Sequence, residues 1–373
     1  MSIDPRKMPK LGFGLMRLPE KDRVIDFEQV CRMADLYMEH GFNYFDTAYI
    51  YHGGNSEKIV KTALVERHPR NSFTVATKLP GWCLEKPEDM ERIFLEQLVR
   101  TGTGFFDYYL IHSIEDEKGY EKHTALRSFE WTARKREEGL IRHLGFSFHG
   151  TPELLRKIVS EHPEVEFVQI QLNYADWDNP DVQSGALYKI LREHDIPIIV
   201  MEPVKGGSLA NPIPAVKQIF SELPSAPTPA SLALRFAGSL DGVATILSGM
   251  STEEQMLENI RTCSPLSRLT PEEGSAIRKA VEIIRSTPLI GCTSCRYCCD
   301  GCPQQIPIPD IFRIMNSIRQ YNDAPQEIAH YRYQTRNSGR AKDCIACGQC
   351  ESVCPQHLEI VSLLADGSRI LDA

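Results

Sequence analysis

Eight cysteines near the end of the chain repeat one pattern, C-x2-C-x2-C-x3-C-P. The two copies lie 52 residues apart, and their cysteines are Cys292, Cys295, Cys298 and Cys302, followed by Cys344, Cys347, Cys350 and Cys354. Runs of this kind bind 4Fe–4S clusters, the first three thiolates holding one cluster and the fourth holding the other. This crossing rule predicts two clusters, one bound by Cys292, Cys295, Cys298 and Cys354, and the second by Cys344, Cys347, Cys350 and Cys302.

The other cysteine signals are weaker. Structural zinc is the alternative for C-x2-C pairs, but a repeated four-cysteine run that ends in Cys-Pro favours iron–sulfur chemistry. Cys299 lies outside the pattern. We favour its interpretation as a small buried filler over a spare thiol or an alternative ligand.

Four polar residues accompany apolar, β-rich runs in the first part of the chain: Asp46, Tyr51, Lys78 and His112. Reduction of a carbonyl by hydride leaves an alkoxide that needs a proton, and a phenol with a pKa near 10 is too weak an acid by itself. Lys78, held charged by Asp46, would lower the pKa of Tyr51. His112 would donate a hydrogen bond to the carbonyl oxygen. Each residue alone has an ordinary structural explanation, so the prediction depends on the four occurring together.

The elements that must position these residues are eight short apolar runs separated by amphipathic stretches. The runs span residues 11–15, 42–48, 73–79, 107–112, 142–148, 167–172, 196–201 and 244–250. Continuous apolar runs are typical of parallel strands buried on both faces, and eight strand–helix repeats predict a (β/α)8 TIM barrel. A doubly wound sheet is the rival, but the first strand–helix turn lacks G-x-G-x-x-G. Active sites of such barrels lie at the carboxyl ends of the strands.

Three helix starts are also marked. Thr151 precedes Pro152, and proline suits the first turn of a helix. Ser251-x-x-Glu254 and Thr270-x-x-Glu273 are capping boxes, in which the hydroxyl accepts a hydrogen bond from an otherwise unpaired backbone N–H.

Residues 8–262 resemble the aldo-keto reductase family. The matching segments are GFGLMRLP (12–19), FDTAYIYHGGNSE (45–57), TKL (77–79), YYLIH (108–112), GFS (145–147), QIQLN (169–173) and EEQMLENI (253–260). The five-residue offset between Asp46 and Tyr51 is that of the family. The resemblance implies that Tyr51 is the general acid/base, assisted by Asp46, Lys78 and His112. It also implies a nicotinamide cofactor that lies extended across the barrel mouth.

The same resemblance implies where the nicotinamide would be held. Ser147 and Gln169 correspond to residues that bind its carboxamide. Met201 stands where an aromatic side chain normally stacks on the ring. Phe148 replaces the asparagine that usually follows the serine.

The implied contacts to the rest of the cofactor leave NAD and NADP as alternatives. Glu258 and Asn259 correspond to adenine contacts, whereas Gln255 stands where an arginine often pairs with the 2′-phosphate. An uncharged amide cannot replace a guanidinium on phosphate. Lys205 lies next to Gly206 in the turn at 203–207. We consider two interpretations of it equally, a contact to the phosphate and a solvated loop charge.

The whole chain resembles a subgroup of aldo-keto reductases with a C-terminal ferredoxin-like domain. We expect the barrel over residues 1–285 and a small, mainly helical domain with two 4Fe–4S clusters over 286–373, including a helix near 306–321. A hydride carries two electrons together, whereas a cluster passes one at a time. Electron exchange with an external carrier, a ferredoxin or flavodoxin, therefore needs a mediating step, and the position of Met201 leaves space for a flavin.

Three functions stay open on this basis. The first is an oxidoreductase that transfers hydride at a carbonyl or alcohol and exchanges electrons through the clusters. The second is an ordinary NAD(P)H-dependent aldehyde or ketone reductase with structural or redox-sensing clusters. The third is a non-enzymatic redox-responsive binding module, which the intact set of four polar residues disfavours. Phe13, Tyr49 and Trp82 are candidate pocket walls, which indicate a small-molecule substrate with some hydrophobic body.

Composition excludes other classes of function. The 42 basic and 50 acidic residues give a net charge of −8, so no basic footprint predicts nucleic-acid binding. No apolar run reaches the length of about 18 residues that spans a bilayer. The first ten residues lack the apolar stretch of a signal peptide, and we expect a cytoplasmic protein with no membrane partner.

Overall fold

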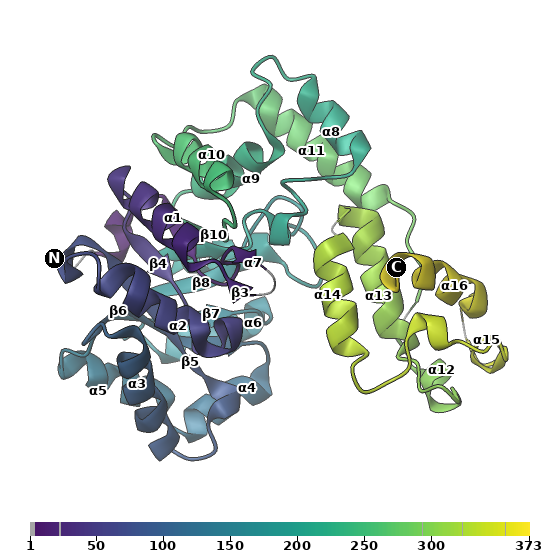
Figure 1. Cartoon of the computed structure of the whole chain (residues 1–373), viewed down its shortest axis with the longest axis horizontal. Coiled ribbons are helices and arrows are strands. Elements are labelled where there is room, and N and C mark those ends of the chain that lie inside the picture. Colours follow the sequence, from purple (N-terminus) through teal and green to yellow (C-terminus); the bar gives the residue numbers. More distant parts are fainter. Residues whose placement is uncertain (1–3, 22–23, 293, 323, 355) are drawn as a thin grey trace. The chain divides into compact units, whose positions relative to one another are not determined.

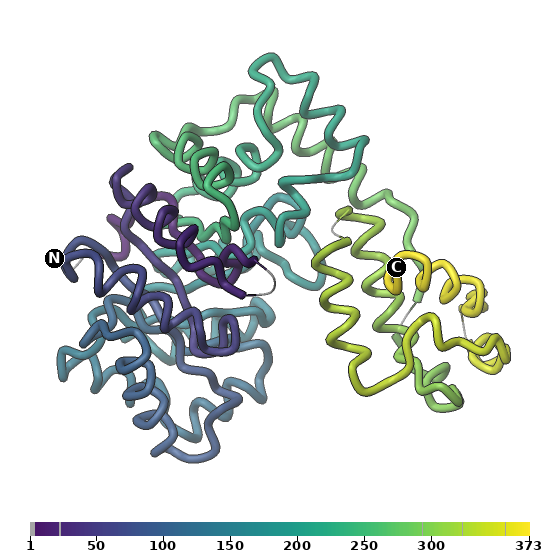
Figure 2. Tube along the Cα trace, viewed as in Figure 1, coloured from purple at the N-terminus to yellow at the C-terminus, as the bar shows by residue number. Residues whose placement is uncertain are grey.

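The computed structural model describes residues 4–21, 24–292, 294–322, 324–354 and 356–373. Apart from these gaps, the first of two compact units spans Met1–Val204 and Ala230–Thr270, and the second spans Lys205–Pro229 and Pro271–Ala373 (Figures 1 and 2). The second unit thus takes in helices α8 (Pro214–Ser221) and α11 (Pro271–Ser286). The expected barrel of residues 1–285 includes α8 and all of α11 except Ser286.

Eight parallel strands close into a barrel in the order β1-β10-β9-β8-β7-β6-β5-β4. The strands are β1 (Leu11–Gly14), β4 (Tyr44–Asp46), β5 (Thr74–Pro80), β6 (Phe106–Ile114), β7 (Ile141–Phe148), β8 (Phe167–Gln171), β9 (Ile198–Met201) and β10 (Val243–Ser248). Each predicted apolar run contributes one of them, so the (β/α)8 barrel is confirmed. A short antiparallel pair, β2 (Glu20–Lys21) and β3 (Val24–Ile25), follows β1.

Helices lie outside the barrel strands (Figure 1). They are α1 (Phe27–Glu39), α2 (Asn55–Ile59), α3 (Glu88–Thr101), α4 (Glu117–Ala125), α5 (Ser128–Glu137), α6 (Pro152–Glu161), α7 (Ser184–Glu193), α9 (Pro229–Gly238) and α10 (Glu253–Cys263). Their apolar faces pack against the strands, as in α1, where Val30, Met33 and Tyr37 are buried. Within the described ranges, no helix has the length and apolar character needed to cross a bilayer.

One of the helix caps predicted from the sequence is confirmed, and another is wrong. Thr151 caps α6, its hydroxyl accepting from the backbone N–H of Leu154 at 3.4 Å. The prediction of Ser251 as the cap of α10 is wrong. Thr252 is the cap and accepts from the N–H of Gln255 at 3.2 Å, because the Ser251 hydroxyl is occupied in donating to the carbonyl oxygen of Arg17 at 2.8 Å.

Large aromatic side chains fill the barrel interior. The ring of Tyr108 contacts those of Tyr44 and Phe167 edge-on, with centroids 5.2 and 5.5 Å apart. Gly145 on β7 allows β8 to approach closely, since a Cβ there would lie 2.5 Å from the Phe167 ring and 2.6 Å from its carbonyl oxygen. The barrel is therefore a packed core, and polar chemistry is confined to its ends.

The second unit is helical in its described part. Its helices besides α8 and α11 are α12 (Tyr297–Asp300), α13 (Ile308–Tyr321), α14 (Ala324–Gln334), α15 (Gln349–Ser352) and α16 (Ile360–Leu371). Helices α13 and α14 lie side by side (Figure 2). A separate apolar core, which includes Phe312, Met315 and Leu364, holds the unit together, and α13 confirms the helix predicted near residues 306–321.

We predict that Gly145→Ala destabilises the barrel by about 1–3 kcal/mol or more, because the added methyl group overpacks the β7–β8 contact. Urea unfolding followed by tryptophan fluorescence reports this unit, since Trp82, Trp131 and Trp177 all lie in it. Gly119→Ala in α4, which lies in the same unit, is the control, because its Cβ meets only a carboxylate oxygen of Asp116, at 3.3 Å. An unchanged transition for Gly145→Ala would contradict the close packing.

Candidate active site and cluster cavities

Lys78 and Asp46 form a buried ion pair at the carboxyl ends of neighbouring strands. The ammonium Nζ donates to Oδ1 of Asp46 at 2.6 Å and to the backbone oxygen of Thr47 at 2.7 Å. Both charged side chains are almost fully enclosed. Although burial opposes it, the Asp46 carboxylate raises the pKa of Lys78, with a further contribution from Tyr51. The ammonium is therefore held charged inside the barrel mouth.

Tyr51 lies on a tight turn, Tyr51–Gly54, that faces this ammonium. Lys78 Nζ is 5.1 Å from the centroid of the Tyr51 ring. Burial raises the pKa of the Tyr51 phenol above 10, and Lys78 opposes that rise without overcoming it. The expected net lowering of the Tyr51 pKa is thus wrong for this structure, because desolvation of the phenolate outweighs its attraction to the ammonium.

His112 completes the group. Its ring centroid lies 6.1 Å from that of Tyr51 and 5.0 Å from that of Trp82. Burial, together with the charges of Lys78 and His149, lowers the pKa of His112 well below 6.5. The imidazole is therefore neutral at neutral pH and can donate one N–H. Its Nδ1 is buried and has no hydrogen-bond partner in the described part of the chain.

The sequence interpretation missed His52, which anchors the turn that carries Tyr51. His52 has a left-handed backbone (φ 50°), as does Gly53 after it. Its Nε2 accepts from the backbone N–H of Leu18 at 3.3 Å, and its Nδ1 lies 3.1 Å from Oε1 of Glu20. These bonds tie the turn to the segment after β1. The Gly-Gly pair that follows His52 was the available signal for a turn with positive φ.

Of the three candidate pocket walls, one lies beside the group formed by Asp46, Tyr51, Lys78 and His112. Trp82 is half exposed and adjoins His112. Phe13 is instead enclosed by packing against Tyr37 and Phe45, and the Tyr49 hydroxyl donates to Glu96 at 2.8 Å.

Three residues implied as nicotinamide contacts come together at the ends of β7, β8 and β9. Ser147 pairs in register with Gln169, and its hydroxyl accepts from the N–H of Ser113 at 2.8 Å. Gln169 Nε2 lies 3.5 Å from the sulfur of Met201. The amide oxygen of Gln169 is buried and has no partner among the described residues. An unpaired acceptor of this kind fits the N–H of a carboxamide.

The other implied contacts have structural partners. Gln255 Oε1 accepts from the backbone N–H of Ser251 at 2.8 Å, and Asn259 Nδ2 donates to the hydroxyl of Ser248 at 2.9 Å. Glu258 lies between them on α10 and is partly exposed. In the second unit, Lys205 Nζ lies 4.7 Å from the ring centroid of Tyr321.

Gly206 follows Lys205 in that unit with a left-handed backbone (φ 68°) and abuts Gln326. The turn is therefore packed against α13 and α14 within the second unit.

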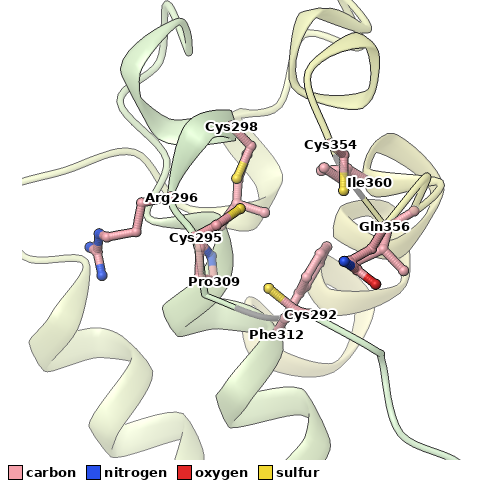
Figure 3. A pocket seen from close by; sticks show the side chains of 11 residues that line it. Cys292, Cys295, Arg296, Cys298, Pro309, Phe312, Cys354, Gln356 and Ile360 are labelled. Carbon is pink, nitrogen blue, oxygen red and sulfur yellow. The ribbon is translucent and has the colours of Figure 1, made fainter.

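The cysteine motifs form two cavities in the second unit. The first is lined by Cys292, Cys295, Cys298 and Cys354, and the second by Cys302, Cys344, Cys347 and Cys350. Figure 3 shows the four sulfur atoms of the first set around one space, beside Phe312 and Ile360. These are the sets that the crossing rule assigns, and thiolates in apolar surroundings suit 4Fe–4S clusters.

Two further observations concern the cysteines. Cys299 is half-buried, packs against the apolar core of the unit and lines neither cavity. In the described residues, no three His, Cys, Asp or Glu side chains converge closely enough to share a single metal ion.

We predict that Lys78→Met lowers the free energy of unfolding by about 3–5 kcal/mol, because it leaves the Asp46 carboxylate buried and unpaired. The double variant Lys78→Met/Asp46→Leu removes both charges and should recover most of that loss. Urea unfolding of both variants measures the difference. A cost below about 1 kcal/mol for the single variant would show that the pair is not desolvated.

Comparison with known proteins agrees with this geometry. Residues 10–282 match the model of the aldo/keto reductase family, and residues 291–358 match that of the 4Fe-4S dicluster domain. An aldo-keto reductase of Mycobacterium avium (strain 104) is 30% identical over 258 residues, which are 69% of this chain and 81% of the relative.

Solved structures show the same fold. The holo form of an aldo-keto reductase from Bacillus halodurans has a TM-score of 0.59 and 25% identity, covering 72% of this chain and 91% of that one. An aldo/keto reductase from Klebsiella pneumoniae, in complex with NADP and acetate, has a TM-score of 0.59 and 21% identity, covering 73% and 91%. The chain therefore belongs to the aldo/keto reductase family of oxidoreductases, and it carries a 4Fe–4S dicluster domain in addition to the barrel.

Proposed function

We propose that the protein reduces a small carbonyl compound, or oxidises the corresponding alcohol, with Tyr51 as the general acid/base. We further propose that its second unit binds two 4Fe–4S clusters that exchange electrons with an external carrier. The observation that carries the proposal is the Lys78 ammonium, fixed by Asp46 and directed at the Tyr51 ring at 5.1 Å. An arrangement of this kind serves proton transfer to a developing alkoxide.

The chain's own residues divide the proton chemistry among them. Tyr51 gives its hydroxyl proton to the substrate oxygen in reduction and takes it back in oxidation. Lys78 stabilises the phenolate that remains, since it lies beside the ring and keeps its charge. Neutral His112 donates one hydrogen bond to the same substrate oxygen and so fixes its direction.

Ser147, Gln169 and Met201 would hold the nicotinamide, which supplies the hydride when it is bound. The unpaired amide oxygen of Gln169 supports this assignment. The Klebsiella pneumoniae relative binds NADP. Gln255 offers no cation for a 2′-phosphate, so we expect this chain to accept NADH as well as NADPH.

The cysteines Cys292, Cys295, Cys298 and Cys354 would hold the first cluster, and Cys302, Cys344, Cys347 and Cys350 the second. Clusters of this type store and pass single electrons. A flavin at the barrel mouth would couple one- and two-electron steps, and Met201 leaves the stacking position without an aromatic ring.

An ordinary NAD(P)H-dependent reductase is the second candidate. One observation favours it: Tyr51, Lys78, Asp46 and His112 all lie in the first unit, so hydride reduction there needs no electron from the cysteine unit. The clusters would then be structural or redox-sensing.

The test of the electron route is anaerobic. Protein purified without oxygen should contain about eight iron atoms per chain on the two-cluster proposal. NADH or NADPH is then added, with and without substrate, and the EPR spectrum is recorded. A reduced-cluster signal supports the coupled oxidoreductase. A silent spectrum, with clusters that dithionite still reduces, supports the ordinary reductase instead.

We predict that Tyr51→Phe lowers kcat for carbonyl reduction by about 10²–10⁴-fold, the usual contribution of a positioned acid. Tyr49→Phe is the matched control, because it removes a hydroxyl that bonds to Glu96. It should stay within about twofold of the native rate. Steady-state assays with a panel of aldehydes measure both variants, and an active Tyr51→Phe would remove Tyr51 from the proposed role.

The pH dependence of reduction should follow the shifted pKa values of Tyr51 and His112. Because burial raises the Tyr51 pKa above 10, the phenol keeps its proton, and kcat/KM should fall only above about pH 10. Because the His112 pKa lies well below 6.5, no inflection should occur near that pH. A profile of kcat/KM recorded from about pH 6 upward measures both, and a loss of activity centred near neutrality would contradict the assignment.

A further inference from the structure

The surface over the second cysteine cavity exposes apolar side chains. Ile345 is 58% exposed, and Cys347 is also exposed. Val353, which is 45% exposed, directly follows α15, the helix that carries Cys350 of this cavity. Ile345 and Cys347 belong to the wall of the cavity itself. A cluster held by Cys302, Cys344, Cys347 and Cys350 would therefore lie directly beneath this apolar surface.

Basic side chains that form no ion pair among the described residues lie in the segment that leads to Cys344. Lys342 and Arg336 are exposed, and neither makes an ion pair with any described residue. The Arg336 guanidinium lies 4.2 Å from the centroid of Tyr333, a ring that is 60% exposed. The hydroxyl of Tyr331 accepts from the N–H of Ala341 at 2.8 Å, which ties the end of α14 to the turn before Cys344.

The carboxylates of the same segment are directed at the backbone. Asp343 Oδ2 accepts from the N–H of Arg340 at 2.8 Å, and Glu351 Oε1 accepts from the N–H of Val361 at 2.8 Å. Hydrogen bonds from backbone N–H groups offset part of their negative charge. The exposed surface is therefore apolar with a basic margin.

The surface at the first cysteine cavity has a different charge pattern. Arg296, the basic residue of that cavity wall, pairs with Asp310 at 2.9 Å. Asp300 lies on the adjoining helix α12. The two cavities thus differ in the charge at their walls, since the basic residue that lines the first is paired with a carboxylate, whereas Lys342, two residues before Cys344 of the second, makes no ion pair with a described residue.

We propose that the surface formed by Arg336, Lys342, Ile345 and Val353, with Tyr333, is the docking face for a small acidic one-electron carrier protein. The inference rests on the proposed function, because it requires a cluster in the second cavity. In each encounter one electron leaves the reduced carrier, which is oxidised, and enters the second cluster, which is reduced. No bond forms or breaks in this transfer at the cluster. Two encounters supply two electrons, and carbonyl reduction would take them with two protons, one of them from Tyr51, through the mediating flavin of the proposed function.

The apolar centre and basic margin of the surface agree with such a partner. Transient electron-transfer complexes bury less area than stable assemblies. They rely on complementary charge to steer the encounter and on a small apolar centre for close approach. Attraction between a basic margin and an acidic protein weakens as salt screens it, with a Debye length of about 10 Å at 0.1 M.

The test measures binding of an oxidised acidic bacterial ferredoxin to the anaerobic, cluster-loaded full-length protein by titration calorimetry at low and high salt. Arg336→Glu/Lys342→Glu should weaken binding about tenfold or more at low salt. Arg278→Glu/Lys279→Glu on α11 is the matched control, with the same charge change at exposed positions outside the surface. It should stay within about twofold. Basic cytochrome c should not bind.

A second readout separates this inference from the proposed function. Dithionite should reduce the clusters equally in all variants, whereas reduced ferredoxin should reduce them more slowly only in Arg336→Glu/Lys342→Glu. Equal weakening in both double variants, or no binding to the native protein, would overturn the docking face. If the iron content shows that the clusters are absent, the proposed function itself fails.

Discussion

The ion pair between Lys78 and Asp46 is the constraint on which the chemistry of the barrel depends. Each of these charges would lose several kcal/mol on leaving water alone, so neither is stable at this depth without the other. The backbone oxygen of Thr47 accepts a second hydrogen bond from the ammonium and fixes its direction. A permanent positive charge is thereby available to Tyr51 and His112. Burial keeps His112 neutral and this charge adds to the effect; in the proposed function it would also stabilise the phenolate that proton transfer from Tyr51 leaves behind.

The turn that carries Tyr51 has a conformation that its sequence alone would not favour. A side chain other than glycine costs roughly 1–2 kcal/mol in the left-handed region, yet His52 adopts it. The bonds from its ring to Leu18 and Glu20 compensate for that cost. Tyr51, the proposed proton donor, is thus positioned by two supports, the buried ion pair on one side and the segment after β1 on the other.

The cavities of the cysteine unit depend on the packing of two separate loops. Three sulfur atoms of each cavity come from one short loop, and the fourth comes from the other motif, so the two loops must pack together for either cavity to form. Ile308 contributes to the walls of both cavities. Apolar walls of this kind control the polarity around a cluster and hence its reduction potential. Because the four polar residues lie in the first unit and the cysteine cavities in the second, the proposed proton transfer and the proposed cluster binding can be assayed separately.

The sequence by itself determined the barrel, helix α13 and the division of the eight cysteines into two sets of four. All three follow from local periodicity or spacing. The sequence also brought Asp46, Lys78 and His112 to one end of the barrel, since parallel strands place their carboxyl ends at one edge. Only the tertiary structure decided the net pKa of Tyr51, the capping role of Gln255, the enclosure of Phe13 and the anchoring by His52. Each depends on burial or on partners distant in the chain, and desolvation in particular is a property of the surroundings that no spacing of residues encodes.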